Sequence, residues 1–399
     1  MTISRLSRLA SQDRRLVAGL MSGTSLDGVD AVLADIRGTG RGLEITIRAF
    51  VTVPYPQALV DALMANSSPE SSDVRTISQL NVRLAHEYAV AVRRLTDEAG
   101  VPLSDVDLIG SHGQTIHHVP DAADCAGIRV TSTLQIGDPS VLANLLGIPV
   151  VGDFRVADMA LGGQGAPLVP YFDYVYFSSE SETRALLNLG GIANITVLPQ
   201  SGRAEDVIAF DTGPANMLID GLSLKFFGEA YDTGGKRALS GRIDDEFLAD
   251  LLLSDPYLAQ EPPKSTGREH YNEAYVRQVI GDGMARGLSE TDILTTATSF
   301  TASSVYQAYA RFIRARRTID VLIVAGGGRH NSFLMQKLRD SFAPIPVVPS
   351  DDYGLPSDAK EALCFAVLAH ETAGGAPTNL PSVTGASHHT LLGKICLPA

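Results

Sequence analysis

Residues 19–30 read GLMSGTSLDGVD, a turn rich in Gly, Ser and Thr between two apolar segments. The apolar segments, Arg15–Leu20 and Val29–Ile36, have the length and composition of β-strands. The pattern therefore predicts a strand, a turn and a second strand. The turn, Met21–Gly28, is longer than a two-residue hairpin requires. Its extra length and its content of Gly, Ser and Thr therefore require a separate explanation.

The same arrangement returns near the middle of the chain. Arg184–Leu187 (RALL) leads into Asn188–Ala193 (NLGGIA), and Asn194–Leu198 (NITVL) follows as the next strand. A third glycine turn, Ala325–Asn331 (AGGGRHN), comes after the apolar strand Val321–Val324 and opens a helix. The two hairpins share an architecture but little sequence, so alone they are weak evidence of an internal duplication.

Between and after these turns, predicted strands alternate with predicted helices. Val74–Glu98 and Lys360–Thr372 are predicted helices, and Val106–Ile109 is a short apolar strand followed by the small-residue loop Gly110–Thr115. This alternation predicts an α/β fold with ligand sites at the strand ends. The length of 399 residues favours two domains, with a boundary near residues 153–185.

Composition excludes several classes of function. The formal net charge is −13 and no stretch concentrates Lys and Arg, so nucleic acid is not an expected partner. No apolar run approaches the roughly 20 residues of a membrane span, and the Arg-containing N-terminus has no secretory pattern. Three scattered cysteines, Cys125, Cys364 and Cys396, fit structural thiols in a reducing cytosol. We therefore expect a cytoplasmic protein.

The turn at Gly23–Gly28 has the chemistry of an anion-binding nest. Glycine lets successive backbone N–H groups point at a ligand, and the hydroxyls of Thr24 and Ser25 add donors. Asp27 or Asp30 could orient water on a metal ion. The Lys of a P-loop is absent, and a strand follows instead of a helix. A polar hairpin turn remains the alternative for this segment alone.

Three glycine turns in two halves of the chain are a stronger signal than one. A cleft that holds ATP phosphates from both sides needs this distribution, and a helix N-terminus after the third turn favours a nucleotide. The expected ATP-binding residues are Gly23, Thr24, Ser25, Leu26, Asp27, Gly28, Val29, Asp30, Gly190, Gly191, Asn194, Gly326, Gly327 and Asn331.

Two acids are candidates for catalysis and for Mg²⁺ binding. Asp211 follows an apolar strand and precedes Thr-Gly-Pro, a position from which a general base could reach its proton. Its alternative role is an N-cap for the following helix. Glu361 lies at the start of an apolar helix, where a solvated first-turn acid is the alternative.

Polar residues near other glycines are candidates for binding a substrate. His112 and Gln114 flank Gly113 after a strand, and could hydrogen-bond sugar hydroxyls. Asp153 follows another strand, and Gln164 lies in the glycine-rich loop 161–167. His117 and His118 are more simply read as structural or exposed, because no acid or Cys completes a metal set there.

Ten segments together resemble the anhydro-N-acetylmuramic acid kinases, a family of the acetate and sugar kinase/Hsp70/actin superfamily. They cover nearly the whole chain after residue 15, in the family's order. They are GLMSGTSLDGVD (19–30), IGSHGQT (109–115), LQIGDP (134–139), VVGDFR (150–155), ALGGQGAPLVP (160–170), LNLGGIANIT (187–196), FDTGPANMLID (210–220), DPYLAQEPPKSTGRE (255–269), VAGGG (324–328) and NLPSVTGAS (379–387).

The resemblance implies a two-lobed sugar-kinase fold, each lobe a mixed sheet with flanking helices, that binds ATP, Mg²⁺ and the sugar between the lobes. We expect an N-terminal extension at 1–15, a first lobe at 16–160 with a return at about 375–399, and a second lobe at 161–374. The implied reaction opens 1,6-anhydro-N-acetylmuramic acid with water and phosphorylates O6, as part of cell-wall peptidoglycan turnover. A homodimer is implied by family analogy.

In the implied mechanism, Asp211 activates water and Glu361 assists with Mg²⁺ or its waters. One departure from the family pattern is Ala215, which stands where Gly is usual. Another 1,6-anhydro sugar such as levoglucosan remains an alternative substrate. A non-catalytic ATP-binding regulator is a further alternative, although residues 1–15 are too short for a DNA-binding helix-turn-helix.

Overall fold

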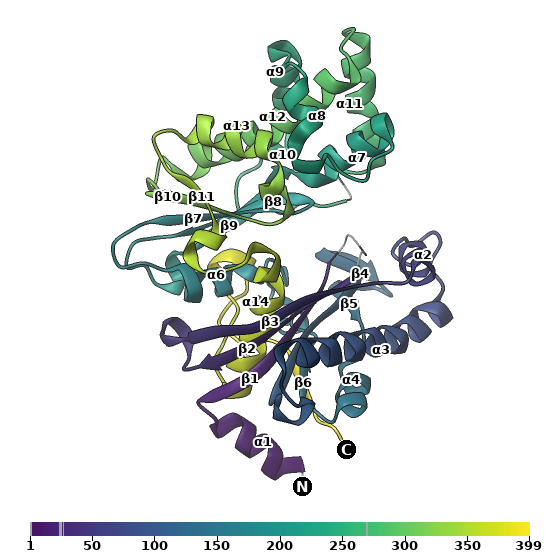
Figure 1. The fold of residues 1–399 in the computed structure, drawn as a ribbon, viewed down its shortest axis with the longest axis vertical. Helices are drawn as coiled ribbons and strands as arrows, with labels where there is room; N and C mark the ends of the chain where they lie inside the picture. The colour runs from purple at the N-terminus through teal and green to yellow at the C-terminus, as the bar shows by residue number, and fades with distance from the viewer. Residues whose placement is uncertain (1, 24–25, 27, 269) are drawn as a thin grey trace. The chain divides into compact units, whose positions relative to one another are not determined.

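The computed structural model describes residues 2–23, 26, 28–268 and 270–399. The chain forms two compact units, each with its own sheet. Unit 1 comprises residues 1–176 and 359–399, and unit 2 comprises residues 177–358. Because the positions of the two units relative to one another are not determined, each is described by itself (Figure 1).

Over its described residues, unit 1 contains a seven-stranded sheet, six α-helices in its first segment and two in its second. Its elements are α1 (Thr2–Ser11), β1 (Arg14–Ser22), β2 (Gly28–Arg37), β3 (Glu44–Pro54), α2 (Gln57–Ala65), α3 (Val74–Ala99), β4 (Leu108–Cys125), β5 (Ile128–Ile136), α4 (Pro139–Leu146), β6 (Val150–Gly152), α5 (Val156–Ala160), α6 (Val169–Phe177), α14 (Lys360–Gly374), α15 (Pro381–Thr384) and β12 (Lys394–Cys396).

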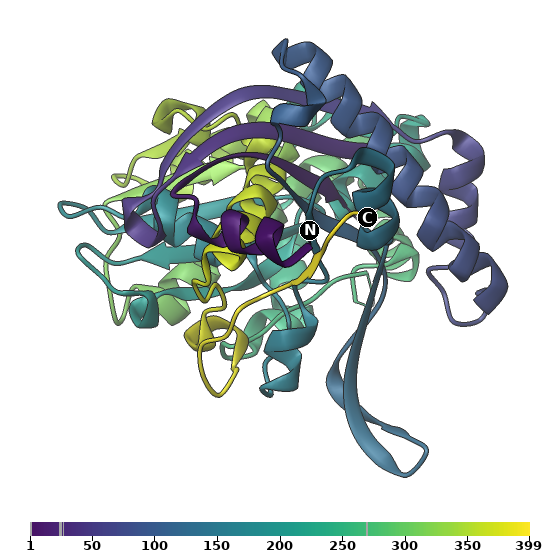
Figure 2. The same ribbon diagram turned by 90° about the horizontal axis from the view of Figure 1, so that it is seen from below.

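The sheet of unit 1 is mixed. Its strand order is β12-β6-β4-β1-β2-β3, and β5 pairs with β4 outside this path. Strands β1, β2 and β3 are antiparallel neighbours, whereas β1, β4 and β6 are parallel. Beyond the sheet, β4 and β5 continue as a long two-stranded ribbon that Figure 2 shows extending from the unit.

Helices cover both faces of this sheet. Ala18 and Leu20 of β1 belong to the apolar cluster that includes Leu84 and Tyr88 of α3. Gly19, between them, points to the other face, where a Cβ would lie 2.0 Å from the carbonyl oxygen of Ala362 in α14. Since successive strand residues face opposite sides, the glycine allows α14 to pack directly on the sheet backbone.

Unit 2 contains a five-stranded sheet and seven α-helices within the residues that the structure describes. Its elements are β7 (Arg184–Leu189), β8 (Ile192–Leu198), β9 (Ile208–Pro214), α7 (Asn216–Phe227), α8 (Lys236–Ser240), α9 (Asp245–Ser254), α10 (Pro256–Ala259), α11 (Glu273–Ala285), α12 (Glu290–Ala308) with a π-helical end at Tyr309–Ile313, β10 (Val321–Ala325), α13 (Ser332–Phe342) and β11 (Val347–Pro349). Short 3₁₀ turns at Thr233–Gly235 (η4) and Gly327–His330 (η6) lie beside the candidate site.

The two sheets repeat one topology. The order in unit 2 is β11-β10-β7-β8-β9, with β7, β8 and β9 antiparallel and β7, β10 and β11 parallel. Strands β6, β4, β1, β2 and β3 have the same order and directions in unit 1. The architectural match of the two hairpins therefore extends to five strands, and the expected α/β fold with two mixed sheets is confirmed.

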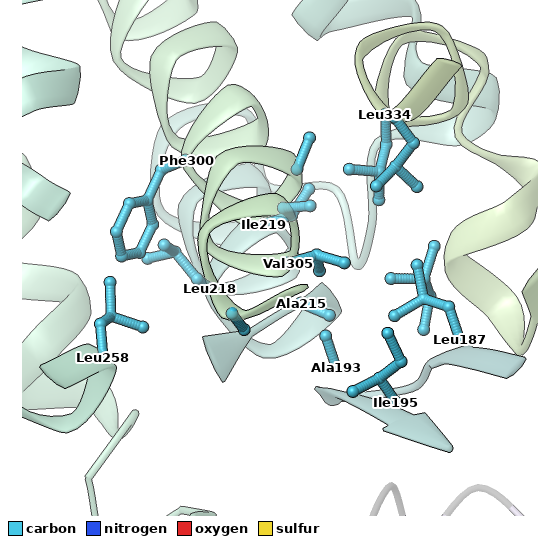
Figure 3. Close-up of a cluster of buried hydrophobic side chains, with 14 of the residues drawn as sticks. Leu187, Ala193, Ile195, Ala215, Leu218, Ile219, Leu258, Phe300, Val305 and Leu334 are labelled. Carbon is cyan, nitrogen blue, oxygen red and sulfur yellow. The ribbon is translucent and has the colours of Figure 1, made fainter. Parts of the chain in front are cut away.

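An apolar core joins the sheet of unit 2 to its helices. Figure 3 shows Leu187, Ala193 and Ile195 from the strands beneath Ile219 of α7 and Val305 of α12. All five side chains are almost fully buried. Burial of a side chain such as leucine or isoleucine contributes roughly 1.5–3 kcal/mol, so this cluster fixes α7 firmly on the sheet that carries the glycine turns.

The structure differs from the sequence prediction at the N-terminus and after residue 109. Most of the expected loose extension is the helix α1, whose Leu9 is buried, and Arg15 donates hydrogen bonds to the Leu9 carbonyl. The segment Gly110–Thr115, expected as a small-residue loop after a strand, is part of β4. Gly110 serves packing instead, because a Cβ there would lie 2.0 Å from the carbonyl oxygen of Phe365 in α14.

The first boundary between the units, at residues 176 and 177, lies within the expected range of 153–185, while both boundaries differ from the expected lobe limits of 160 and about 375. Unit 1 includes α6 and the whole of α14. The physical reason is the close packing of α14 on β1 and β4, which the backbone contacts at Gly19 and Gly110 require. Glu361, which we expected in the second lobe, consequently belongs to unit 1.

Candidate active site

Asp211 lies within β9, directly opposite Asn194 of β8, where the ladder between the two strands is irregular. Its carboxylate Oδ2 accepts a hydrogen bond from the backbone N–H of Thr266 (2.9 Å). The alternative role as a helix cap does not apply, since Ala215 occupies the N-cap position of α7. The expected loop residue Asn194 is thus a strand neighbour of the candidate base.

The backbone of Asp211 is held by the segment that follows α9. The hydroxyl of Tyr257 donates to the Asp211 carbonyl oxygen (2.8 Å), and the Asp211 N–H donates to the carbonyl oxygen of Lys264 (3.3 Å). Asp255 anchors this segment, because its carboxylate accepts from the Tyr271 hydroxyl (2.8 Å) and caps α10. The motif that spans 255–269 therefore has a positional role that sequence alone did not reveal.

Lys264 is a buried cation beside this acid. Its ammonium donates to the carbonyl oxygen of Tyr257 (3.1 Å) and lies 4.5 Å from the centre of the Tyr257 ring and 5.1 Å from that of Phe312. Burial lowers the pKa of Lys264 to about 8, while the nearby Asp255 and Asp211 carboxylates act in the opposite direction. A positive charge near Asp211 favours the ionised carboxylate that a general base requires.

The two glycine turns of unit 2 converge with the start of α7. The carbonyl oxygens of Gly190 and Gly191 accept hydrogen bonds from the N–H groups of Asn216 and Met217 (3.0 Å each). Gly326 has φ of +85°, and a Cβ there would lie 2.7 Å from the Asn188 side chain. Only glycine suits this close approach in the left-handed region. The sequence predicted both turns as ATP-binding, and the structure brings them together.

Beside these turns, unit 2 has a pocket of about 590 Å³. Two of the residues that line the pocket, Gly327 and Asn331, were predicted to bind ATP. Gly327 lines it with its backbone. The lining residues are Asn216, Ile219, Asp220, Tyr231, Asp232, Thr233, Gly234, Gly327, Gly328, His330 and Asn331. Asn331 also caps α13 through its side chain, which accepts from the Leu334 N–H (3.0 Å). The volume suits a small molecule.

Sequence reasoning missed Asn216 and Asp220 in this pocket. Both belong to the quoted segment 210–220, and their spacing of four residues places them on one face of α7. That spacing is the signal that could have identified them. Ala215 is compatible with its site, because its φ of −129° lies outside the left-handed region that favours glycine.

In unit 1, the first predicted phosphate turn joins β1 to β2. Thr24, Ser25 and Asp27 lie outside the described residues. Leu26 is buried with φ of +60°, an uncommon conformation for a non-glycine residue that marks local strain. Gly28 is required by close contact, since a Cβ would lie 2.3 Å from the Val53 carbonyl oxygen.

The last two residues predicted in this turn are strand residues with partners. Val29 is fully buried, so only its backbone could meet a ligand. Asp30 accepts a hydrogen bond from the Thr52 hydroxyl on β3 (2.6 Å). The described part of the turn is therefore a tightly held end of the β1–β2 hairpin.

His112 and Gln114 are buried beneath this turn. The amide of Gln114 accepts from the Ser22 hydroxyl and donates to the Gly23 carbonyl oxygen (3.0 Å). His112 Nδ1 donates to the Ser22 carbonyl oxygen (3.3 Å), and its Nε2 accepts from Arg155 (2.8 Å). Burial and the Arg155 charge lower the pKa of His112 to about 3, so the ring is neutral near pH 7. Both side chains were predicted to bind the sugar. In the structure they are hydrogen-bonded to the protein and hold Ser22 and Gly23, at the start of the turn, in place.

Asp153 and Gln164 have different surroundings. Asp153 follows β6 with φ of +58° and forms an ion pair with Lys394 of β12. The backbone N–H of Gln164 donates to the Thr384 carbonyl oxygen (2.9 Å). The loop containing Gln164 is anchored by the buried Asp158, which accepts from the N–H of Gly165 (2.8 Å).

Glu361 lies in the first turn of α14 and is half-buried. Arg155, buried nearby, has its pKa lowered to about 10 by burial, while Glu361 and Cys364 act in the opposite direction. Glu361 is therefore close enough to a buried guanidinium to interact with it electrostatically. This is a more specific environment than that of a solvated helix-end acid.

The two expected Mg²⁺ ligands belong to different units, Asp211 to unit 2 and Glu361 to unit 1. No cluster of three or more His, Cys, Asp or Glu side chains arranged to hold a metal occurs among the residues in the described ranges. Mg²⁺ characteristically keeps several waters and binds one or two carboxylates together with substrate phosphates. A single carboxylate such as Asp211 or Glu361 fits this preference. In the same described part of the chain, no helix is both long and apolar enough to cross a membrane.

Comparison with known proteins gives one consistent family. The family described as anhydro-N-acetylmuramic acid kinase matches residues 15–398. A protein of that name from Salinibacter ruber (strain DSM 13855 / M31) is 56% identical over 393 residues, which cover 98% of this chain and 99% of that protein. Another, from Caldanaerobacter subterraneus subsp. tengcongensis, is 43% identical over 397 residues, covering 99% of this chain and 100% of that protein.

Proposed function

The chain belongs to the anhydro-N-acetylmuramic acid kinase family, and on that premise we propose that it uses Mg-ATP to convert 1,6-anhydro-N-acetylmuramic acid into N-acetylmuramic acid 6-phosphate. The observation that supports this most directly is the environment of Asp211. Its carboxylate is oriented by the Thr266 N–H, and the glycine turns of the same unit lie beside a pocket of nucleoside size.

In the proposed reaction, water attacks C1 of the anhydro sugar and the bond between C1 and O6 breaks. Asp211 accepts one proton of the attacking water, as a general base does. The liberated O6 attacks the γ-phosphorus of ATP, and ADP leaves with the bridging oxygen. Attack on one face with departure of O6 from the other resembles the geometry of an inverting glycosidase.

Residues of the chain have distinct parts in this scheme. Gly190, Gly191, Gly326 and Gly327 offer close backbone approach to the nucleotide, as does the turn from Gly23 to Asp30. Asp211 and Glu361 would hold Mg²⁺ directly or through its waters. When bound, the ion neutralises charge on the phosphates of ATP.

His112 and Gln114 contribute as positioning residues in this proposal. Their hydrogen bonds fix Ser22 and Gly23 at the start of the phosphate turn. Gln164 and Asp153 stay proposed substrate contacts, Gln164 through its side chain. Asp153 would have to exchange its ion pair with Lys394 for a sugar hydroxyl.

The decisive test incubates the protein with Mg-ATP and 1,6-anhydro-N-acetylmuramic acid in ¹⁸O-labelled water. We expect a sugar 6-phosphate whose label is at C1 and whose phosphate is unlabelled, identified by mass spectrometry with fragmentation. A parallel incubation with levoglucosan tests the alternative sugar, and we expect much slower turnover. Binding of ATP with no turnover of either ATP or sugar would contradict the proposal and favour the non-catalytic ATP-binding regulator.

A further inference from the structure

Asp220 is a carboxylate in the unit 2 pocket that the reaction does not use. It lies on α7 one turn after Asn216, a rise of about 6 Å along the helix. Both residues line the pocket, together with the backbone of Gly327 and Gly328. The Asp220 carboxylate forms no hydrogen bond or ion pair with any residue in the ranges that the structure describes. A half-buried acid without such partners is poised to accept hydrogen bonds from a ligand.

The carboxylate of the neighbouring acid, Asp232, already accepts hydrogen bonds from the protein. Its two carboxylate oxygens accept from the N–H groups of Arg237 (2.9 Å) and Ala238 (3.0 Å) at the start of α8. The guanidinium of Arg237 is directed to Glu229, with which it forms an ion pair. Burial, with the Asp232 charge as a second cause, raises the pKa of Asp220 to about 7.

The remaining titratable groups around α7 are few. Tyr231 and His330 line the same pocket, from the segment before η4 and from η6. On α11, Glu273 pairs with Lys225 of α7, away from the pocket residues. Beyond its first turn, α12 carries no charged residue. Asp220 is therefore the acidic residue of this pocket whose protonation a bound ligand can alter.

A carboxylate is better suited to bind the ribose of a nucleoside than its adenine. A ribose presents two neighbouring hydroxyl donors, which match the two acceptor oxygens of an ionised carboxylate. The adenine edge presents an amino donor beside the N7 acceptor, which a carboxylate would repel. In dinucleotide-binding folds an acid plays the same part toward a ribose hydroxyl.

We propose that Asp220 recognises the ribose of the nucleotide by accepting hydrogen bonds from its vicinal hydroxyls, and so selects ribonucleotides over deoxyribonucleotides. This inference rests on the proposed function in that the pocket takes the nucleoside of ATP. The inference adds to that function a residue that determines nucleotide specificity, and it makes this specificity dependent on pH. Because hydroxyls donate to the ionised carboxylate, selection for ribose strengthens as pH rises through 7 and weakens as Asp220 becomes protonated.

The test measures dissociation constants for ATP, 2′-deoxy-ATP and 3′-deoxy-ATP by isothermal titration calorimetry, with wild type and Asp220→Asn, at pH 6 and pH 8. At pH 8 we expect the wild type to bind ATP about tenfold or more tightly than at least one deoxynucleotide. At pH 6 this ratio should be smaller. Using the ratio cancels the titration of the phosphates, which the three nucleotides share.

In Asp220→Asn the ratio should fall to within about twofold at both pH values. Asp282→Asn, an exposed aspartate of α11 outside the pocket, changes the charge equally and should keep the wild-type ratios. Equal wild-type affinities for all three nucleotides, or an unchanged ratio in Asp220→Asn, would overturn the inference. Failure of the wild type to phosphorylate the anhydro sugar with ATP would instead reject the proposed function, so the two failures are distinguishable.

Discussion

Asp211 is held in place by the segment that follows α9. The Thr266 N–H contacts its carboxylate, and the Tyr257 hydroxyl contacts its carbonyl oxygen. Neither contact depends on a mobile surface side chain. A candidate base fixed in this way has a defined carboxylate orientation.

The first prediction concerns Asp211→Asn. An amide oxygen can still accept from the Thr266 N–H, but it cannot take a proton from water near pH 7. We expect kcat to fall by about 10²–10⁴-fold, with the dissociation constant for ATP changed less than about twofold. Asp282→Asn, an exposed change on α11, is the control. An unchanged kcat would show that Asp211 is not the base.

A second prediction concerns Glu361→Gln. If this carboxylate holds Mg²⁺ or its waters, the neutral amide weakens metal binding and lowers activity. We expect the Mg²⁺ concentration for half-maximal rate to rise several-fold, measured by titrating the ion at saturating ATP. Glu98→Gln on the exposed side of α3 is the matched control. A variant with the wild-type rate and Mg²⁺ response would leave Glu361 with a purely structural role.

The third prediction follows from the low pKa of His112. Its folded pKa is about 3 and its ordinary value 6.5, so the unfolded chain binds the proton first as pH falls. The free energy of unfolding should therefore decrease below pH 6.5, by up to about 1.4 kcal/mol per pH unit from this residue. Urea unfolding at pH 7 and pH 5 should show a shallower decrease for His112→Asn.

His118 and His370 also have lowered pKa values from burial, and they remain in both proteins. The difference between wild type and His112→Asn therefore isolates the contribution of His112. Identical pH dependence in the two proteins would mean that the His112 ring is not buried as a neutral group.

Among the elements, α14 depends on two glycines of the sheet beneath it. Our fourth prediction is that Gly110→Ala destabilises the protein by about 1–3 kcal/mol, because a Cβ would collide with the Phe365 carbonyl oxygen and force the helix outward. Gly374→Ala at the exposed end of the same helix meets no atom within 4 Å and should change stability by less than about 0.5 kcal/mol. Chemical denaturation of both variants tests this, and equal stabilities would contradict it.

The sequence predicted most elements because their periodicity is local. Lys360–Thr372 and Val321–Val324, for example, lie within α14 and β10. The small-residue loop expected at Gly110–Thr115 is instead part of β4, and Gly110 has a packing role there. The cause of that role is contact with a helix about 250 residues later, which no local pattern contains. The burial of His112 and Gln114 was unpredictable for the same reason.

For the whole molecule, the matching strand orders of the two sheets explain why glycine turns recur in both halves. A hairpin pattern visible at two places in the sequence marks one five-strand topology used twice. The family was evident from ordered motifs, yet Asp220 was not, since its importance lies in a pocket assembled from three separated segments. Pockets of this kind require tertiary structure.

We also propose that the chain forms a homodimer, as the family resemblance implies. Sedimentation equilibrium at micromolar concentration should then give twice the chain mass of 42.3 kDa. The measurement should be repeated with ATP, since a ligand that binds the assembled form shifts association. A mass of one chain over the whole concentration range would reject the homodimer.

The return of residues 359–399 to unit 1 has a consequence for biosynthesis. A ribosome adds about 5–20 residues per second, so β1, β2 and β4 leave it on the order of ten seconds before α14 exists. During that interval the sheet face around Gly19 and Gly110 has no α14 to cover it, and all of unit 2 is synthesised before α14 appears. The nascent first half should therefore be the part of the chain that depends most on chaperones, and the unit begun first should be the last to finish folding.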